Sequence, residues 1–350
     1  MSRELDDAPL AALAWALEGG VIAAPAGAAV LLDARAGHGL PRPGWRCVQP
    51  LRPAFEALRA QGVDALPQPE PDAAPAAAVY VLAPRAREAA RARLAQAVDA
   101  LAPGGLVVAV AGNSEGGRGL QADLDALLGQ ARSEAKHRCR IAWAACAPER
   151  LDAALLAQWR ALAQVQRLQQ DGLAFWSRAG LFAWDRIDAA SALLAEHLPT
   201  DLSGRVADAG AGWGFLSMTL LRCCPGITAL ELFEADARAL EPARRNLDEA
   251  LAGRTHVATA VHWHDVTVGL PGRFDAVVMN PPFHVGRVDD PDLGRAFIAR
   301  AAEALTPRGA LWLVANRHLP YEATLAQRFQ QVTPIAAREG FKVICARGPR

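Results

Sequence analysis

The stretch RVADAGAGWGFL, residues 205–216, decides the fold class. It begins with an apolar run, passes through Asp208 into three glycines at alternating positions, and ends on apolar residues. A strand, a glycine-rich turn and a helix in this order form the first half of a βαβ unit, which builds a parallel sheet. Glycines let the turn bring its backbone close to a ligand. The stretch therefore predicts an α/β domain with a binding site at the turn.

Strand and helix patterns continue to alternate on both sides of this stretch. Apolar runs typical of buried strands are AVYVLAP, GGLVVAVAG, TALELF, FDAVVMN, GALWLVAN and FKVICAR. Apolar residues at helical spacing occur in REAARARLAQAVDALAP, RIDAASALLAEHL, ARALEPARRNLDEAL and AFIARAAEAL. We expect a loop over the proline-rich residues 67–78 and a helical connection over residues 151–178.

One comparison within the chain indicates a duplication. VLLDARAGHGL, residues 30–40, repeats the apolar strand, the aspartate and the glycine-rich turn of residues 205–216, but Arg35 replaces the leading glycine. We therefore predict two Rossmann-like α/β domains in tandem. Residues 1–165 form the degenerate copy, and residues 166–350 form the domain that carries the site.

Composition limits the class of protein. The formal net charge of the 350 residues is zero, so the overall field does not indicate nucleic acid, although a local basic cleft is compatible with it. The six cysteines show no C-x-x-C spacing, which argues against a zinc site. No apolar run approaches the ~18 residues of a membrane span, and the first residues lack an apolar signal core. These features predict a cytoplasmic protein without a metal or a membrane anchor.

Acidic side chains follow three successive predicted strands. Asp208 precedes Gly210, Gly212 and Gly214, and Glu234 ends the next strand, TALELF. Asp265 is at the end of the third strand, HVATAVHWHD. The spacing G-x-G-x-G differs from the G-x-G-x-x-G of dinucleotide folds. A carboxylate at the loop suits an ammonium group, one about 20 residues later suits ribose hydroxyls, and a third suits an adenine amine. Together they favour S-adenosylmethionine over NAD.

The segment NPPF, residues 280–283, ends a predicted core strand in an unusual way. A residue before proline is held in extended geometry, so Asn280 and Pro281 project rigidly beyond the sheet. The amide oxygen of Asn280 and the carbonyl of Pro281 form two acceptors for the two hydrogens of an exocyclic amine. Phe283 offers a face for stacking a base, worth about 1–3 kcal/mol. This predicts methylation of a nucleobase amine by positioning and electrostatics.

These residues resemble a known family. NPPFH, with GLFAWDRID (180–188) upstream and LVANRHLPY (313–321) downstream, is similar to the bacterial rRNA guanine-N2 methyltransferases, both the small-subunit enzyme and its large-subunit paralogue. That family fuses a degenerate methyltransferase-like domain to a catalytic one. The resemblance implies S-adenosylmethionine as cofactor and ribosomal RNA or a ribosomal subunit as substrate, with the 16S type favoured over the 23S type. It leaves the oligomeric state open.

The resemblance also assigns roles to residues of this chain. The cofactor-binding set consists of Asp208, Gly210, Gly212, Glu234, Asp265, Phe182 and Asp188. The catalytic set consists of Asn280, Pro281 and Phe283, and the substrate-binding set consists of Pro282 and His284. One position departs from the family pattern, because Ala190 stands where a glycine is expected after Asp188.

Other functions remain open at this point. Release-factor glutamine methyltransferases and DNA adenine methyltransferases use related tetrads, and the Phe283-His284 pair favours rRNA guanine over both. An inactive RNA-binding assembly factor would be expected to lose residues of the second half, which are intact. A dehydrogenase is disfavoured by the glycine spacing. Lys136, His137, Arg138 and Arg140 form a basic cluster that would serve RNA binding in the first half.

Overall fold

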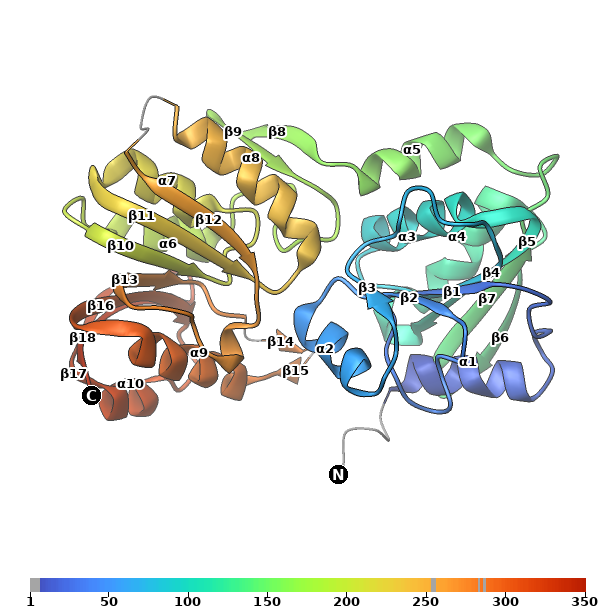
Figure 1. Ribbon diagram of the computed structural model, residues 1–350, viewed down its shortest axis with the longest axis horizontal. Helices are drawn as coiled ribbons and strands as arrows, with labels where there is room; N and C mark the ends of the chain where they lie inside the picture. The colour runs from blue at the N-terminus through green and yellow to red at the C-terminus, as the bar shows by residue number, and fades with distance from the viewer. Residues whose placement is uncertain (1–6, 253–255, 283, 286–287) are drawn as a thin grey trace. The chain divides into compact units, whose positions relative to one another are not determined.

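The computed structural model describes residues 7–252, 256–282, 284–285 and 288–350. The chain divides into two compact units, which are described separately (Figure 1). Unit 1 contains Met1–Val165 and the short segment Arg178–Gly180. Unit 2 contains Gln166–Ser177 and Leu181–Arg350.

Each unit is built on a seven-stranded sheet, and the two sheets have the same topology. The order is β3-β2-β1-β4-β5-β7-β6 in unit 1 and β12-β11-β10-β13-β16-β18-β17 in unit 2. In both sheets the first five strands pair in parallel, and the last two pair antiparallel. The prediction of two tandem α/β domains is therefore confirmed.

The elements of unit 1 follow the predicted alternation of strands and helices. Its strands are β1 (Ala29–Leu32), β2 (Arg46–Val48), β3 (Ala65–Leu66), β4 (Ala76–Leu82), β5 (Leu101–Gly112), β6 (Arg132–Lys136) and β7 (Cys139–Ala145). Its helices are α1 (Ala8–Glu18), α2 (Arg52–Ala60), α3 (Arg87–Asp99), α4 (Arg118–Leu128) and α5 (Ala153–Ala163), with the short η1 (Asn113–Gly117) before α4.

Unit 2 begins with a hairpin of β8 (Gln166–Gln170) and β9 (Leu173–Ser177). The strands of its main sheet are β10 (Ser203–Ala209), β11 (Gly226–Glu234), β12 (Ala258–Trp263), β13 (Phe274–Met279), β16 (Leu305–Asn316), β17 (Phe329–Arg338) and β18 (Phe341–Pro349). Its helices are α6 (Ala189–His197), α7 (Phe215–Cys223), α8 (Leu240–Ala250), α9 (Pro291–Ala304) and α10 (Glu322–Arg328). The short elements are η2 (Ala237–Ala239), η3 (Val266–Val268), β14 (His284–Val285) and β15 (Val288–Asp289).

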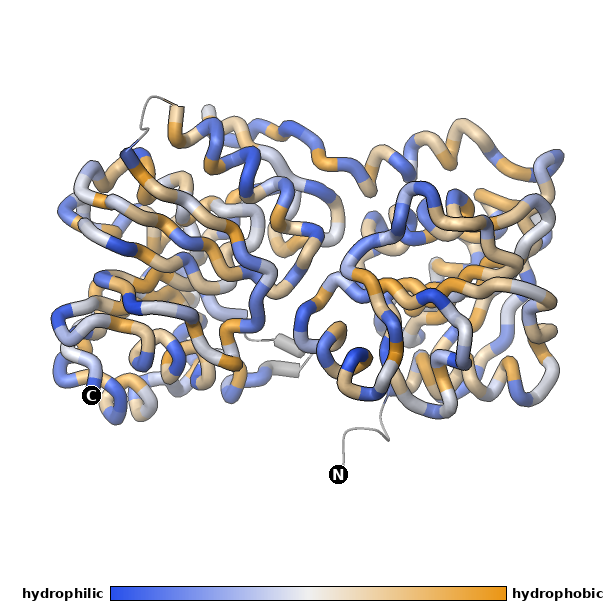
Figure 2. The backbone as a smooth tube through the Cα atoms, viewed as in Figure 1, coloured by the Kyte–Doolittle hydropathy of each residue, from blue (hydrophilic) through white to orange (hydrophobic). Residues whose placement is uncertain are grey.

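Side chains that alternate along the unit 2 strands pack into two apolar layers, one on each face of the sheet. On β13, Val278 packs with α6, α7 and α8, whereas Val277 and Met279 pack with α9 and α10. Both faces are covered, so the central strands read as continuous apolar runs. In Figure 2 the central strands of unit 1 are coloured hydrophobic in the same way. The buried sheet leaves the ends of its strands as the place where polar side chains gather.

The expected helical connection over residues 151–178 is only half correct. The chain is helical through Ala163 and then forms the β8–β9 hairpin. The hairpin turn at Asp171 and Gly172 has positive φ values of 50° and 80°. A glycine in that position favours a turn over a continuing helix. Strand β17 was not predicted from the sequence either.

The first copy of the glycine turn is closed by ion pairs. Asp33 accepts two bonds from the buried Arg93, at Oδ1 and Oδ2, each 2.7 Å long. Arg35, in place of the leading glycine, donates to Asp7. Arg93 thus engages both oxygens of Asp33, which is the counterpart of Asp208 in the second copy.

Among the described residues, no helix combines the length and the apolar character that crossing a bilayer requires.

Candidate active site

Four loops of unit 2 meet where neighbouring parallel strands end. β12, β11, β10 and β13 are adjacent in the sheet, and their carboxyl ends lead to Asp265, Glu234, the glycine turn and Asn280 respectively. Register supports this proximity, since Ala209 pairs with both Phe233 and Met279. Ligands of open α/β sheets bind at this edge, where the connections diverge to either side.

The glycine turn has the backbone conformation that its sequence predicts. Gly210, Gly212 and Gly214 have φ values of 76°, 56° and 93°. A Cβ at Gly210 would press against Phe297, and one at Gly214 would contact Leu232 and Ala243. A Cβ at Gly212 would meet nothing within 4 Å. Gly212 therefore faces open space, which is the cradle that a ligand would fill.

Asp208 lies beneath this turn rather than on its surface. Its side chain is 1% exposed, and its Oδ2 accepts a 2.6 Å bond from the Ser217 hydroxyl. Its Oδ1 is buried and has no hydrogen-bond partner among the residues that the structure describes. Burial raises the pKa of Asp208 to about 6, against a smaller lowering by Ser217. The carboxylate thus has one acceptor left for a ligand cation.

Glu234 fixes the turn from the next strand. Its Oε2 accepts from the Gly212 N–H at 2.7 Å, and its Oε1 accepts from the Asp236 N–H at 2.8 Å. Desolvation raises the pKa of Glu234 to about 7, although both backbone bonds lower it. The competing acid in the same strand, Glu231, is instead paired with Arg205 at 2.5 Å and His262 at 3.0 Å. Of the two acids, Glu234 is the one at the strand end.

Asp265 begins the short helix η3. Its Oδ1 accepts from the Thr267 N–H at 2.8 Å and from the Thr267 hydroxyl at 2.7 Å. It lies one strand beyond Glu234 in the sheet. Its position at the strand end is as expected, and Oδ1 serves as a helix cap.

Asn280 is held in a single orientation by two side chains of helix α6. Its Nδ2 donates to Asp188 Oδ2 and to Ser191 Oγ, both at 2.9 Å. A carboxylate only accepts hydrogen bonds, so the nitrogen side of the amide must face Asp188. Oδ1 of Asn280 consequently points away from Asp188. Asp188 itself is fixed because it caps α6 through the Ser191 N–H at 2.8 Å.

One pocket brings several of the sequence-predicted residues together. Its lining comprises Phe182, Ala183, Asp188, Ser191, Gly210, Ala211, Gly212, Trp213, Phe215, Leu216 and Asn280. Phe182 is 66% exposed, which leaves its ring free to cover a ligand. Glu234 adjoins the pocket through its bond to Gly212. Asp208 and Asp265 do not line the pocket in this structure.

The residues after Asn280 are only partly described. Pro281 is buried and Pro282 is exposed, in agreement with a rigid segment that leaves the sheet. Phe283 lies outside the described residues. His284 belongs to β14, but its side chain is not described.

Sequence reasoning missed four residues of the site: Ser191, Ser217, Trp213 and Asn246. Asn246 is fully buried on α8, and its Nδ2 donates to the carbonyls of Trp176 and Trp213 at 2.8 and 2.7 Å. Trp213 stacks on Phe175 with ring centroids 4.4 Å apart. The spacing Asp188-x-x-Ser191 was a usable signal, because it is the spacing of a helix cap.

These residues fit S-adenosylmethionine. The unpartnered Oδ1 of Asp208 is an acceptor for an ammonium group, and the open side of Gly212 gives room for a ligand. Glu234 stands at the strand end that suits ribose hydroxyls. Among the described residues, no group of three or more His, Cys, Asp or Glu side chains could hold a metal ion.

Comparison with known proteins gives the family. The model of the Methyltransferase small domain family matches residues 172–345. A ribosomal RNA small subunit methyltransferase C of Shewanella sp. (strain W3-18-1) is 30% identical over 265 residues, which are 76% of this chain and 74% of that protein. The chain therefore belongs to the same family as this ribosomal RNA small subunit methyltransferase C.

Other relatives match over shorter stretches. The namesake from Shewanella oneidensis is 35% identical over 54% of this chain and 53% of its own length. A ribosomal RNA large subunit methyltransferase G of Alcanivorax borkumensis is 36% identical over 49% of this chain and 43% of its own length. The chain thus spans about half the length of these two members.

A solved structure matches both units. It is the T. thermophilus 16S rRNA N2 G1207 methyltransferase (RsmC) in complex with AdoMet and guanosine. The TM-score is 0.78 with 26% sequence identity, and the match covers 99% of this chain and 93% of that one. The two α/β domains of this chain are therefore shared with that relative.

Proposed function

We propose that this protein transfers a methyl group from S-adenosylmethionine to the exocyclic N2 amine of a guanine in ribosomal RNA, with small-subunit RNA as the favoured substrate. The orientation of Asn280 carries the proposal. Its amide nitrogen is engaged by Asp188 and Ser191, so its oxygen is the acceptor that remains for a substrate amine. The AdoMet and guanosine in the T. thermophilus relative support the same pair of ligands.

The cofactor side of the site is assigned to the first three strand ends. Asp208 Oδ1 would accept from the ammonium group, Glu234 from the ribose hydroxyls and Asp265 from the adenine amine. The turn at Gly210 and Gly212 would bring its backbone against the ligand. When bound, the cofactor supplies a methyl group on a positively charged sulfur.

Phe182 and Asp188 complete the proposed cofactor side. The exposed ring of Phe182 would cover the ligand, and Asp188 would line the pocket beside it. Asp188 has a second role in this chain, because it sets the orientation of Asn280.

The substrate side of the site is assigned to the segment after β13. Asn280 Oδ1 and the Pro281 carbonyl would accept the two hydrogens of the guanine amine. This grip favours a pyramidal nitrogen and directs its lone pair at the methyl group, so the catalysis is positional and electrostatic. Phe283 would stack on the base, and Pro282 and His284 would contact the RNA.

The two units would divide the work. We assign catalysis to residues 166–350 and RNA binding or structural support to residues 1–165. The substrate is ribosomal RNA or a ribosomal subunit, which places the reaction in the cytoplasm.

Tritiated cofactor tests the substrate. The full chain is incubated separately with small-subunit RNA, large-subunit RNA, assembled subunits, DNA and release factor, and the labelled product is digested and analysed by mass spectrometry. The proposal expects N2-methylguanosine in small-subunit RNA, and a strongly reduced rate of labelling with the Asn280→Ala variant. Label in release factor or DNA would replace this substrate by glutamine or adenine. Binding of RNA without any label would indicate an inactive assembly factor.

A further inference from the structure

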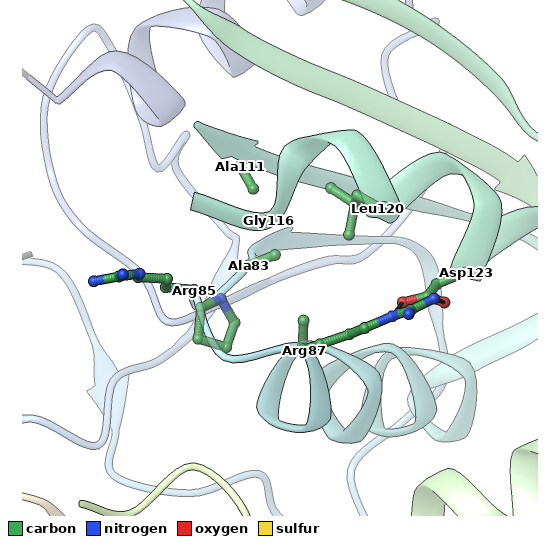
Figure 3. A pocket seen from close by; sticks show the side chains of 10 residues that line it. Ala83, Arg85, Arg87, Ala111, Gly116, Leu120 and Asp123 are labelled. Atoms are coloured by element: carbon green, nitrogen blue, oxygen red, sulfur yellow. Dashed lines mark hydrogen bonds and ion pairs between the residues drawn. The ribbon is translucent and has the colours of Figure 1, made fainter. Parts of the chain in front are cut away.

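Unit 1 contains a pocket that lies outside the methyltransferase site. It opens where the parallel strands β4 and β5 end, between the starts of helices α3 and α4. Figure 3 shows Arg85 at one end of the pocket and the Arg87–Asp123 pair at the other, with Ala83 and Leu120 between them. The pocket thus has an apolar middle, the Arg87–Asp123 pair on one side and Arg85 on the other, and the Arg85 side chain extends outward.

The duplicated unit fills the corresponding space with a side chain. The segment from α3 to α4 has the same spacing as the segment from α9 to α10. Strand β5 begins 14 residues after the start of α3, as β16 does after α9 (101−87 and 305−291). Helix α4 begins 31 residues after the start of α3, as α10 does after α9 (118−87 and 322−291). In unit 2 the ring of Tyr321 is fully buried, and a Cβ on Gly294 would overlap its hydroxyl. The matching positions in unit 1 are Gly117 and Ala90, so unit 1 has no ring there, and Ala90 lines the pocket.

The charges at the pocket are not balanced within it. Arg87 and Arg91 both donate to the one buried carboxylate of Asp123, with Nη2–Oδ1 distances of 2.7 and 2.9 Å. Burial raises the pKa of Asp123, but the bonds from the two arginines outweigh that effect and hold it below its usual value. The carboxylate is therefore charged, and the three groups together keep one positive charge. Arg85 adds a second, because its guanidinium has no ion-pair partner among the residues that the structure describes.

The backbone at the pocket also favours an anion. Helix α3 has no side chain bonded at its N-cap, and its first residue, Arg87, lines the pocket, so the positive end of the helix dipole lies beside the pocket. Gly119, in the first turn of α4, lines the pocket, and a Cβ there would meet nothing within 4 Å. A ligand can consequently approach the helix start closely.

The basic cluster predicted from the sequence lies next to this pocket. It occupies the β6–β7 hairpin, and the Arg138 carbonyl accepts a 2.8 Å bond from the N–H of Asn113, the first residue of η1. Gly117 at the other end of η1 contacts Arg140, because a Cβ there would lie 3.2 Å from the Arg140 Cβ. The hairpin therefore lies beside η1, whose Gly116 lines the pocket.

We propose that this pocket binds a backbone phosphate of the RNA substrate, held by Arg85 and Arg87, and this inference rests on the proposed function. Guanidinium forks match the geometry of phosphate oxygens, and Asp123 keeps Arg87 in position without neutralising the pocket. A phosphate contact fixes the register of the RNA on the protein and reads no base. The pocket would thus contact the RNA backbone and not the guanine that is methylated.

The test compares two double variants of the full chain that lose the same charge. Arg85→Gln/Arg87→Gln removes the proposed contacts, and Arg59→Gln/Arg150→Gln removes two exposed arginines of unit 1 that do not line the pocket. Binding of a single-stranded small-subunit RNA fragment is measured from 50 to 300 mM salt. We expect the first variant to bind about tenfold more weakly at low salt and its salt slope to fall by ~0.7, because one phosphate contact is lost. The control should keep the wild-type slope.

A second variant guards against loss of folding. Gly119→Glu places a carboxylate at the pocket and leaves the Arg87–Asp123 pair intact, and Gly119→Ala is its matched control. Only the glutamate should weaken RNA binding, while cofactor affinity stays at its wild-type value and neither variant unfolds at a lower temperature than the wild type. Equal RNA binding by Gly119→Glu and Gly119→Ala would overturn the proposal.

Two further outcomes separate the ligand sources and the two hypotheses. Binding of inorganic phosphate alone is also titrated. If Arg85→Gln/Arg87→Gln loses phosphate binding but keeps RNA binding, the pocket binds free phosphate and the RNA assignment is overturned. If the wild-type chain methylates RNA but the pocket variants bind that RNA normally, the pocket inference fails and the proposed function stands. If the wild-type chain methylates no RNA, the proposed function itself fails.

Discussion

At the scale of single residues, the proposed chemistry depends on the orientation of the Asn280 amide. Asn280 would be ambiguous in isolation, because its oxygen and nitrogen are similar in size and either could face the pocket. Asp188 and Ser191 remove the ambiguity by accepting both amide hydrogens. The side chain can then act only as an acceptor toward the pocket, which is what gripping an amine requires.

Replacing Asn280 by Ala should therefore separate binding from chemistry. We expect the methyl-transfer rate to fall by about 10²–10³, the usual cost of removing one positioned catalytic dipole. Cofactor affinity should stay near the wild-type value, because the cofactor is assigned to other strand ends. Single-turnover kinetics and calorimetry measure the two quantities. Parallel loss of both would make Asn280 a structural residue.

Asp188 should act through Asn280. Asp188→Asn removes the carboxylate that fixes the amide, and we expect the rate to fall tenfold or more. In a double-mutant cycle, adding Asp188→Asn to Asn280→Ala should cost little further rate, because residues that act as one unit are non-additive. Additive losses would instead assign Asp188 to an independent contact with the cofactor.

The buried acids should make cofactor binding depend on pH. The pKa is raised to about 6 for Asp208 and about 7 for Glu234 by burial. If both bind the cofactor as carboxylates, affinity should rise between pH 5 and pH 8, by up to about tenfold per unit for each group below its pKa. Calorimetry in buffers of different ionisation enthalpy would detect the released protons. A pH-independent affinity without proton release would contradict these roles.

The same shifts should lower the stability of the cofactor-free protein as the pH rises. An acid with a raised pKa in the folded state binds more protons when folded than when unfolded, so unfolding becomes easier as the pH rises from about 4 to 7. Asp208→Asn should flatten this dependence in a series of denaturant titrations. Asp248→Asn, on an exposed position of α8, is a matched control and should leave it unchanged.

At the scale of elements, the glycine turn allows the effect of backbone strain to be distinguished from the effect of filling the pocket. Gly212 and Gly340 both have positive φ values, 56° and 84°, and a Cβ at either would meet nothing within 4 Å. Alanine at either position should destabilise the fold by about 1 kcal/mol through strain alone. Only Gly212→Ala should also weaken cofactor binding, because its methyl group would enter the pocket. Equal cofactor affinity of the two variants would place the ligand elsewhere.

The sequence predicts helices and strands well where one hydrophobic period dominates a segment. It predicts them poorly where a tertiary contact determines the local structure. The apolar runs around Val277 and Leu311 could only be buried strands, and both lie in the centre of the sheet. Residues 166–177 read as a helix, yet they form a hairpin whose end is bound by Asn246 on α8. That contact joins residues 70 positions apart. No local pattern records it.

In the site, too, the sequence predicts single residues but not the contacts between them. The acids and glycines could be predicted because each follows a strand end that the sequence reveals. The pairing of Asn280 with Asp188 joins residues 92 positions apart and depends on α6 lying beside the end of β13. Sequence could nominate both residues, but their contact follows from the packing of the whole domain.

At the scale of the whole molecule, a net charge of zero conceals where the charges lie. Pairs such as Arg93–Asp33 are buried and cancel locally, whereas the β6–β7 hairpin carries Lys136, Arg138 and Arg140 close together. RNA responds to the local field, since salt screens charges beyond about 10 Å at 0.1 M. The total charge therefore says little about whether such a protein binds nucleic acid.

The position of the removed charges, and not their number, should therefore govern how RNA binding changes. Replacing Lys136, Arg138 and Arg140 by glutamine should weaken RNA binding and lower its salt slope by about 2, at ~0.7 per phosphate contact. Replacing Arg59, Arg150 and Arg160 changes the total charge equally and should leave the slope unchanged. Filter binding of small-subunit RNA across salt concentrations measures both. If the two triple variants lose affinity alike, RNA senses the net charge, and unit 1 presents no localised RNA surface at this hairpin.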